Sequence, residues 1–182
     1  MFVAIVGPSG AGKDTVIRAV AEVVRDRPDI IFVRRVITRL SDGTTEDHDT
    51  MTPEAFEAGR EAGMFCLSWG AHGLFYGLPQ SARDAVDRGN IVVANVSRAV
   101  LTEAVRTFGR VAVVEIMADP QILLERIMAR GRESAEEARG RIARSVNFHL
   151  PHATCSYVRI DNSGPIDVAK NQLTEILSSS LV

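Results

Sequence analysis

The chain opens with a glycine-rich loop placed between a strand and a helix. The apolar run Phe2–Val6 leads directly into Gly7–Thr15, which reads GPSGAGKDT and contains the spacing G-x-x-x-x-G-K. Glycines let successive backbone N–H groups turn toward one anion, and the following helix directs the positive end of its dipole to the same point. Lys13 is then placed to reach the outer phosphates of a nucleotide. A plain glycine turn is the alternative, but strand, loop and helix agree, so we predict a nucleotide-binding phosphate loop.

One position of the loop departs from the usual pattern. Asp14 stands where a Ser or Thr normally offers a hydroxyl to magnesium. Asn95 and Ser97 follow a later predicted strand, where many phosphate-loop enzymes keep an acidic residue for the metal. Since both are neutral, we expect Asp14, with Thr15 beside it, to serve a magnesium site. The alternative is that Asp14 only favours the N-terminus of its helix.

The rest of the chain alternates between predicted strands and predicted helices. Strands are predicted over residues 2–6, 30–36, 91–94, 111–117 and 157–160. Apolar residues at helical spacing separate them, which predicts an α/β fold with a central parallel five-stranded sheet flanked by helices. In such a sheet, ligands bind at the carboxyl ends of the strands.

Two segments interrupt this alternation and define the expected domain organisation. Residues 37–90 contain a capped helix start at Thr52 and a short antiparallel pair, Phe65–Trp69 with Leu74–Tyr76. Residues 130–150 are predicted to form an arginine-rich helical hairpin. We expect one domain over residues 1–182, with an acceptor-binding insert at 37–90 and a lid at 130–150. The core then comprises residues 1–36, 91–129 and 151–182.

Arginines gather within and just before the expected lid. The candidates among them are Arg126, Arg130, Arg132, Arg141 and Arg144. Guanidinium groups match phosphate oxygens and offset the charge that develops during phosphoryl transfer, so we predict a lid that closes over phosphates. The alternative is a solvated helix pair with glutamate partners, namely Glu125, Glu133, Glu136 and Glu137.

A second group of arginines lies at the end of the second predicted strand. Arg34, Arg35 and Arg39 are the best candidates for a cationic pocket that holds an anionic acceptor. Ion pairs with nearby acids are the alternative for one or two of them, and these acids are Asp42, Glu46 and Asp47. His48 and His72 are weaker candidates for acceptor binding.

Bulk properties exclude several classes of protein. The net charge is −2 and the pI is near 6.1, so no broad basic face for nucleic acid or membranes is indicated. No apolar stretch approaches the roughly 20 residues of a membrane span, and no charged leader precedes the first apolar run. Cys66 and Cys155 match no metal spacing, and we expect both to be buried free thiols. Together these features predict a cytoplasmic protein.

Several motifs resemble the guanylate kinase family over nearly the whole chain. They are Gly7–Lys13, Thr38-Arg39 and Trp69–Gly77, the last reading WGAHGLFYG. The departures concern base recognition and metal binding. No second arginine follows Thr38-Arg39, His48 stands near a family tyrosine, and Ser68 replaces the glutamate that reads guanine. Asn95 and Ser97 replace acids.

These replacements are similar to those of the ribose 1,5-bisphosphate phosphokinases, relatives of guanylate kinase that act in phosphonate breakdown. Gly12-Lys13-Asp14, Leu67-Ser68-Trp69, Val96-Ser97-Arg98 and Arg130–Glu133 carry this resemblance. It implies transfer of the γ-phosphoryl group of ATP to ribose 1,5-bisphosphate, giving 5-phospho-α-D-ribose 1-diphosphate (PRPP), with Mg²⁺. The implied partners are ATP and a phosphorylated sugar, with a homodimer as an option. A phosphate acceptor is already anionic, so no general base is required.

The resemblance and the charge pattern together give the candidate residues. The catalytic candidates are Lys13, Arg130, Arg132 and Arg141. The ATP-binding candidates are Gly7, Pro8, Ser9, Gly10, Ala11, Gly12, Lys13, Asp14, Thr15, Arg126 and Arg130. The acceptor-binding candidates are Arg35, Arg39, Ser68, His72, Tyr76, Asn95, Ser97, Arg98 and Arg141. Two rival functions remain: a nucleoside monophosphate kinase with altered base recognition, and a non-catalytic module that binds phosphopeptides.

Overall fold

A five-stranded parallel sheet forms the centre of the molecule. The computed structural model describes residues 1–39, 48–71, 73–129, 136, 139–140 and 150–179. The strands, in spatial order, are β2 (Ile30–Phe32), β7 (Ile91–Asn95), β1 (Phe2–Val6), β8 (Val111–Met117) and β9 (Ser156–Asp161). Every residue of β1 is buried, because this strand is central and both faces of the sheet are covered. The predicted central sheet is confirmed.

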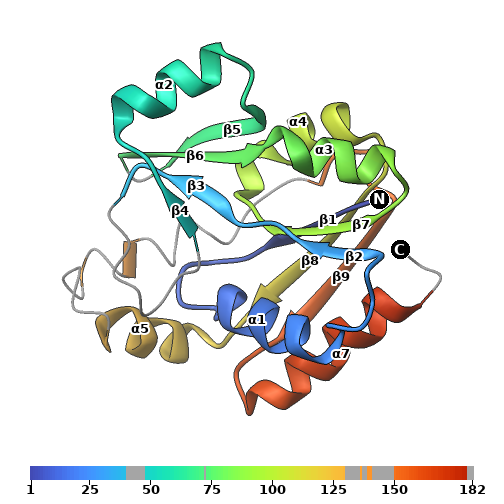
Figure 1. Ribbon diagram of the computed structural model, residues 1–182. Helices are drawn as coiled ribbons and strands as arrows, with labels where there is room; N and C mark the ends of the chain where they lie inside the picture. Colours follow the sequence, from blue (N-terminus) through green and yellow to red (C-terminus); the bar gives the residue numbers. More distant parts are fainter. Residues whose placement is uncertain (40–47, 72, 130–135, 137–138, 141–149, 180–182) are drawn as a thin grey trace.

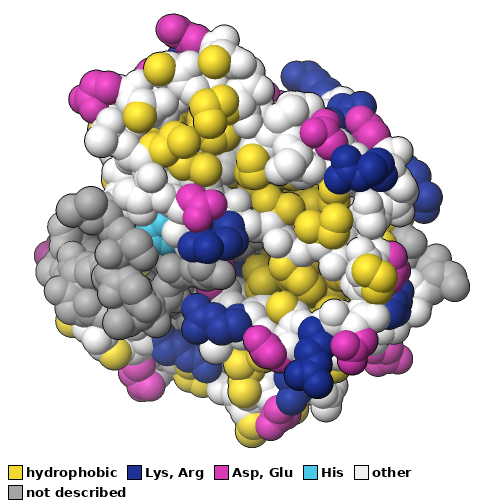
Figure 2. Space-filling view, in the orientation of Figure 1, with side chains coloured by type: hydrophobic (Ala, Val, Ile, Leu, Met, Phe, Trp, Pro, Cys, Tyr) yellow, Lys and Arg dark blue, Asp and Glu magenta, His cyan; other side chains and the backbone are white. Residues whose placement is uncertain are grey.

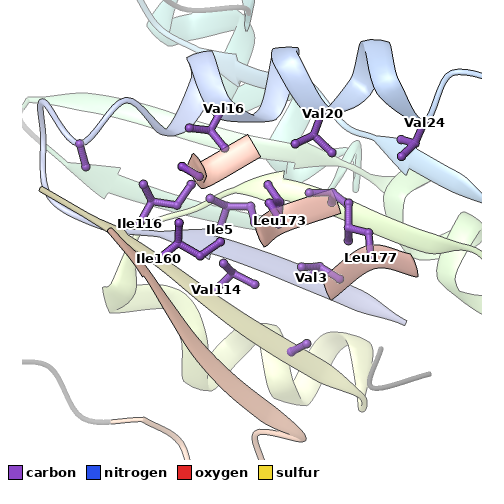
Figure 3. Close-up of a cluster of buried hydrophobic side chains, with 14 of the residues drawn as sticks. Val3, Ile5, Val16, Val20, Val24, Val114, Ile116, Ile160, Leu173 and Leu177 are labelled. Carbon is purple, nitrogen blue, oxygen red and sulfur yellow. The ribbon is translucent and has the colours of Figure 1, made fainter. Parts of the chain in front are cut away.

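Helices cover both faces of this sheet (Figure 1). On one face lie α1 (Lys13–Val23) and α7 (Ile166–Ser178), and on the other lie α3 (Gln80–Asp87) and α4 (Leu101–Phe108). Figure 3 shows the first of the two cores, in which Val16 and Val20 of α1 pack with Leu173 and Leu177 of α7 against the sheet. A further helix, α5 (Pro120–Ala129), follows β8.

A second, smaller sheet lies beside the main one (Figure 1). Its strands, in order, are β4 (His48–Thr50), β3 (Arg35–Ile37), β6 (Leu74–Pro79) and β5 (Phe65–Ala71). The expected antiparallel pair is confirmed as β5–β6. Helix α2 (Pro53–Glu61) begins where Thr52 accepts a hydrogen bond from the N–H of Ala55 at 3.2 Å, as predicted. Phe56 of α2 is buried and stacks on Phe65.

The prediction of a single strand over residues 30–36 is wrong. It is two strands in two different sheets: β2 pairs with β7 of the main sheet, and β3 pairs with β4 and β6 of the second. The N–H of Val33 donates to Val93 at 2.9 Å, and there the pairing with β7 ends. Within the insert range 37–90, Ala82 and Ala85 of α3 are buried in the main core.

The two cysteines are free, but the prediction that both are buried is wrong. Cys155 is exposed, and Cys66 of β5 is partly buried. Burial raises the pKa of the Cys66 thiol to about 11. Among the helices in the described ranges, none has the length and apolar character needed to cross a membrane.

Candidate functional site

The loop between β1 and α1 has the shape expected of a phosphate loop. Gly7, Gly10 and Gly12 have φ angles of 144°, 84° and 81°, in the region that favours glycine. A Cβ atom on Gly7 would lie 2.0 Å from the backbone oxygen of Ile116, so the loop passes very close to β8. Lys13 Nζ donates to the carbonyl oxygens of Gly7 at 2.9 Å and Pro8 at 2.8 Å. The ammonium group is therefore held directly over the loop.

Two side chains from distant elements support the loop from outside. Asn162, which follows β9, donates from Nδ2 to the carbonyl oxygen of Ala11 at 2.8 Å. Arg126 of α5 lies with Nη1 3.5 Å from the carbonyl oxygen of Gly10. Sequence reasoning missed Asn162, although a polar residue directly after a strand at the carboxyl edge was a usable signal.

A cavity of about 350 Å³ opens beside the loop. It is lined by Gly10, Gly12, Thr15, Arg126, Ala129, Asn162, Gly164 and Ile166. Its volume lies at the lower end of the range of small-molecule sites, which is roughly 300–1,000 Å³. The cavity therefore has the position and the size for part of a nucleotide bound at the loop.

Asp14 lies between the loop and the second sheet. Its Oδ1 accepts a hydrogen bond from Asn95 Nδ2 at 2.7 Å, and its Oδ2 lies 3.5 Å from Arg35 Nη2. Asn95 ends β7, and Arg35 begins β3. Three residues from three separate elements therefore meet at one edge of the main sheet.

Arg35 also contacts an aromatic stack on the second sheet. Its guanidinium carbon lies 5.8 Å from the centroid of the Tyr76 ring, and that ring stacks on Trp69 with centroids 5.4 Å apart. Ser68 precedes Trp69 on β5 and lies opposite Gly77. Arg39 follows β3 and accepts a hydrogen bond at its carbonyl oxygen from Thr50 Oγ1 at 3.1 Å. The structure thus brings Arg35, Tyr76, Asn95 and Asp14 together.

Basic side chains gather on this face of the molecule. Figure 2 shows Lys and Arg side chains near the ends of β3 and β4 and over α1 and α5. Like Arg35, Arg34 is engaged in an ion pair: its Nη2 lies 3.3 Å from Asp49 Oδ1 and donates to the His48 carbonyl oxygen at 3.2 Å. His48 itself is buried in β4. The expected partners Asp42, Glu46 and Asp47 lie outside the described residues.

Arg98 belongs to a network around a buried carboxylate. Glu115 of β8 is 2% exposed, and its Oε1 accepts from Arg98 Nη2 at 2.7 Å. Its Oε2 accepts from Tyr157 and, at 3.0 Å, from Arg159. Burial and the hydrogen bond to Glu115 raise the pKa of Tyr157. Sequence reasoning missed Glu115, whose signal is a lone acid inside the apolar run Val111–Met117.

Other candidates have structural partners or lie outside the described residues. Ser97 accepts from the N–H of Ala99 at 3.2 Å and caps the short 3₁₀ helix η1 (Arg98–Val100). The acceptor role of Arg98 and Ser97 stays a prediction. His72, Arg130, Arg132, Arg141 and Arg144 lie outside the described ranges, as do Glu133 and Glu137.

The residues near the loop fit a magnesium ion held largely by phosphates. Oxygen atoms of Asp14, Thr15 and Asn95 lie on the elements that meet at this edge, and magnesium prefers oxygen ligands. In the described part of the chain, His, Cys, Asp and Glu form no cluster of three that could hold a metal alone. Magnesium usually takes one or two protein ligands and fills its shell with phosphates and water, so this sparse set is suitable.

Comparisons with known proteins identify the family. No protein-family model matches the chain. The chain is 45% identical over 165 residues to ribose 1,5-bisphosphate phosphokinase PhnN of Brucella melitensis, covering 91% of this chain and 85% of that one. It is 40% identical over 179 residues to the protein of the same name from Agrobacterium fabrum, covering 98% and 97%.

The fold agrees with this relationship. The structure resembles the crystal structure of guanylate kinase from Anaplasma phagocytophilum with a TM-score of 0.71 and 19% identity, over 100% of this chain and 88% of that one. The resemblance therefore extends over the whole chain, as the motifs predicted. On the sequence relationship and this fold, the chain belongs to the ribose 1,5-bisphosphate phosphokinase family.

Proposed function

We propose that the protein transfers the γ-phosphoryl group of ATP to the 1-phosphate of ribose 1,5-bisphosphate, producing PRPP and ADP, and that it does so in phosphonate catabolism. The observation that carries the proposal is the 40–45% identity, over 91–98% of the chain, to proteins named for this activity. The site supports the proposal, because Lys13 lies over the phosphate loop and Arg35 lies on the second sheet, with the Asp14 carboxylate between the loop and Arg35.

The reaction forms one bond and breaks one. An oxygen of the sugar 1-phosphate bonds to the γ-phosphorus, and the bond from that phosphorus to the bridging oxygen breaks, so ADP leaves with the electron pair. The acceptor oxygen is already anionic, so no side chain needs to remove a proton. The protein then has two tasks, which are to align the reactants and to offset their negative charge.

Each part of the site has a role in this scheme. The loop N–H groups and Lys13 hold the ATP phosphates, and Arg126 lies at the cavity beside them. Arg35 and Arg39 bind the phosphates of the acceptor, with Tyr76 and Ser68 on the same sheet. Arg130, Arg132 and Arg141 of the expected lid add positive charge. Magnesium, held by Asp14 or Thr15 beside the phosphates, would supply further charge neutralisation.

The remaining expectations stay predictions. They are a cytoplasmic location, the absence of nucleic-acid and membrane binding, and the option of a homodimer.

A competition assay tests the proposal. The protein is given ATP, magnesium and equal concentrations of ribose 1,5-bisphosphate and guanosine monophosphate, and ADP and both products are measured. We expect the sugar bisphosphate to be phosphorylated in large preference. A preference for the nucleotide would refute the proposal and favour a nucleoside monophosphate kinase. Failure of ATP to bind in a titration would favour the non-catalytic module.

A further inference from the structure

We propose that Asp14 is a positioning residue that orients Arg35 toward the acceptor and so links the phosphate loop to acceptor binding. This inference rests on the proposed function. This positioning role is an alternative to the magnesium-binding role proposed above for Asp14, and the magnesium dependence of an Asp14 variant separates the two. The observations that carry it are the two contacts of the Asp14 carboxylate and the burial of the groups that make them.

The carboxylate joins elements that are otherwise distant in sequence. Asn95 lies 81 residues from Asp14, and Arg35 lies 21 residues from it. Asn95 is 6% exposed and its amide holds one oxygen of Asp14 at 2.7 Å. The other oxygen therefore faces Arg35 across a 3.5 Å gap. A carboxylate has two acceptor oxygens, so it can bind Asn95 with one and Arg35 with the other. A Ser or Thr hydroxyl has a single oxygen and is less suited to bridge two separate donors.

The pair is shielded from water. The side chain of Arg35 is 11% exposed and that of Asp14 is 20% exposed. Charges in such a setting attract more strongly than surface charges, and a guanidinium so enclosed requires a counter-charge. The Tyr76 ring, backed by Trp69, contacts the same guanidinium from the second sheet. Arg35 is thus held between a ring and a carboxylate.

Orientation of this kind affects acceptor binding more than ATP binding. A guanidinium binds phosphate best through two parallel N–H groups, so its plane must be set before the acceptor arrives. Without Asp14 the guanidinium loses one of the contacts that orient it. The two bonds that hold Lys13 over the loop go to the carbonyl oxygens of Gly7 and Pro8, so we expect them to persist when the Asp14 side chain is changed.

The test uses Asp14→Asn and Arg35→Gln, singly and together. In steady-state assays we expect Asp14→Asn to raise the KM for ribose 1,5-bisphosphate about tenfold. The KM for ATP and the magnesium concentration for half-maximal rate should change by no more than about twofold. In the Arg35→Gln protein, adding Asp14→Asn should raise the acceptor KM by less than about twofold more, because the partner is already gone.

Two further variants make the result secure. Asn95→Ala should raise the acceptor KM in the same direction but less, since it removes the support of Asp14 and leaves the carboxylate beside Arg35. Asp29→Asn is the matched control, because Asp29 pairs with Arg27 at 2.7 Å on the exposed surface, and it should change neither KM. Circular dichroism checks that each variant folds. If Asp14→Asn does not fold, the acceptor KM values of the two single variants Asn95→Ala and Asp14→Ser test the inference instead.

Three results would overturn the inference. The first is a shift in the magnesium dependence of Asp14→Asn with an unchanged acceptor KM. The second is that the effects of Asp14→Asn and Arg35→Gln on the acceptor KM are fully additive in free energy. The third is that Asn95→Ala and Asp14→Ser both leave the acceptor KM unchanged. Failure of the proposed function looks different, since the unmodified protein would then use another acceptor. In that case the same variants are tested with the acceptor that the protein does use. Binding of that acceptor is followed by the fluorescence of Trp69, the single tryptophan.

Discussion

The phosphate loop and the second sheet meet at Asp14, but they are built in different ways. The loop takes its shape from its own backbone, since three glycines have positive φ and Lys13 bonds to carbonyl groups five and six residues away. Arg35 on the second sheet is placed by contacts from other elements, with Asp14 21 residues away. We therefore expect a site shaped by its own backbone and a site assembled from distant elements to respond differently to mutation.

Removal of the loop lysine should have the largest effect on turnover. Lys13→Ala removes the positive charge held over the loop, and we expect kcat to fall about 100- to 1,000-fold. Binding of ribose 1,5-bisphosphate, followed by Trp69 fluorescence, should persist, because Trp69 and Arg35 lie on the second sheet. Lys170→Ala on α7 is the control and should keep full turnover. Equal loss of acceptor binding in Lys13→Ala would break the distinction between the two sides.

The network of Glu115 should be the largest single contributor to stability near the site. Glu115→Gln removes the buried counter-charge of Arg98, whose side chain is 13% exposed. We expect the free energy of unfolding to fall by about 3 kcal/mol, measured by urea denaturation.

A surface pair provides the control for Glu115. Asp87→Asn breaks an exposed pair with Arg83 on α3, at 3.0 Å, and should lower the unfolding free energy by less than about 0.5 kcal/mol. An equal loss in both variants would mean that burial of Glu115 does not matter.

The same difference explains what the sequence predicts well. The phosphate loop, the five parallel strands and the β5–β6 pair follow from local patterns, namely glycine spacing, apolar runs and alternation. The break between β2 and β3 was missed because residues 30–36 carry a continuous strand pattern, and pairing partners far along the chain decide where it divides.

Side-chain partners were the least predictable part of the site. The contact of Asn95 with Asp14 depends on how β7 ends relative to α1, and the Glu115 network depends on the pairing of β8 with β9. Neither follows from spacing within one segment. Cys155 is exposed because it directly precedes β9, which is an edge strand of the main sheet. Composition alone had suggested that this thiol is buried.

Glycine substitutions sharpen the comparison at the loop. Gly12→Ala places a Cβ 2.6 Å from Asn162 Nδ2 at a φ of 81°, so the loop and its support must both move. We expect the KM for ATP to rise about tenfold, with the acceptor KM unchanged, measured by steady-state kinetics.

Gly89→Ala is the matched control for Gly12. Its φ is 90°, but nothing lies within 4 Å of the added Cβ. Both variants should lose about 1–2 kcal/mol of stability from the backbone conformation alone, and only Gly12→Ala should change ATP binding. A normal ATP KM in Gly12→Ala would show that the contact with Asn162 does not shape the loop.

The two cysteines give the smallest and most direct probe of the second sheet. The thiolate is the reactive form, and the pKa of Cys66 is raised to about 11, so at pH 8 this thiol stays protonated. Cys155 is exposed next to β9 of the main sheet. An aromatic disulfide reagent at pH 8 should therefore modify Cys155 at least about ten times faster than Cys66.

Cys66 reacts only when β5 opens, so the rate at which it is modified reports local opening of the second sheet. Ribose 1,5-bisphosphate should slow Cys66 and leave Cys155 unchanged, whereas ATP alone should slow neither. Protection of Cys66 by ATP alone would mean that the phosphate loop stabilises the second sheet without the acceptor.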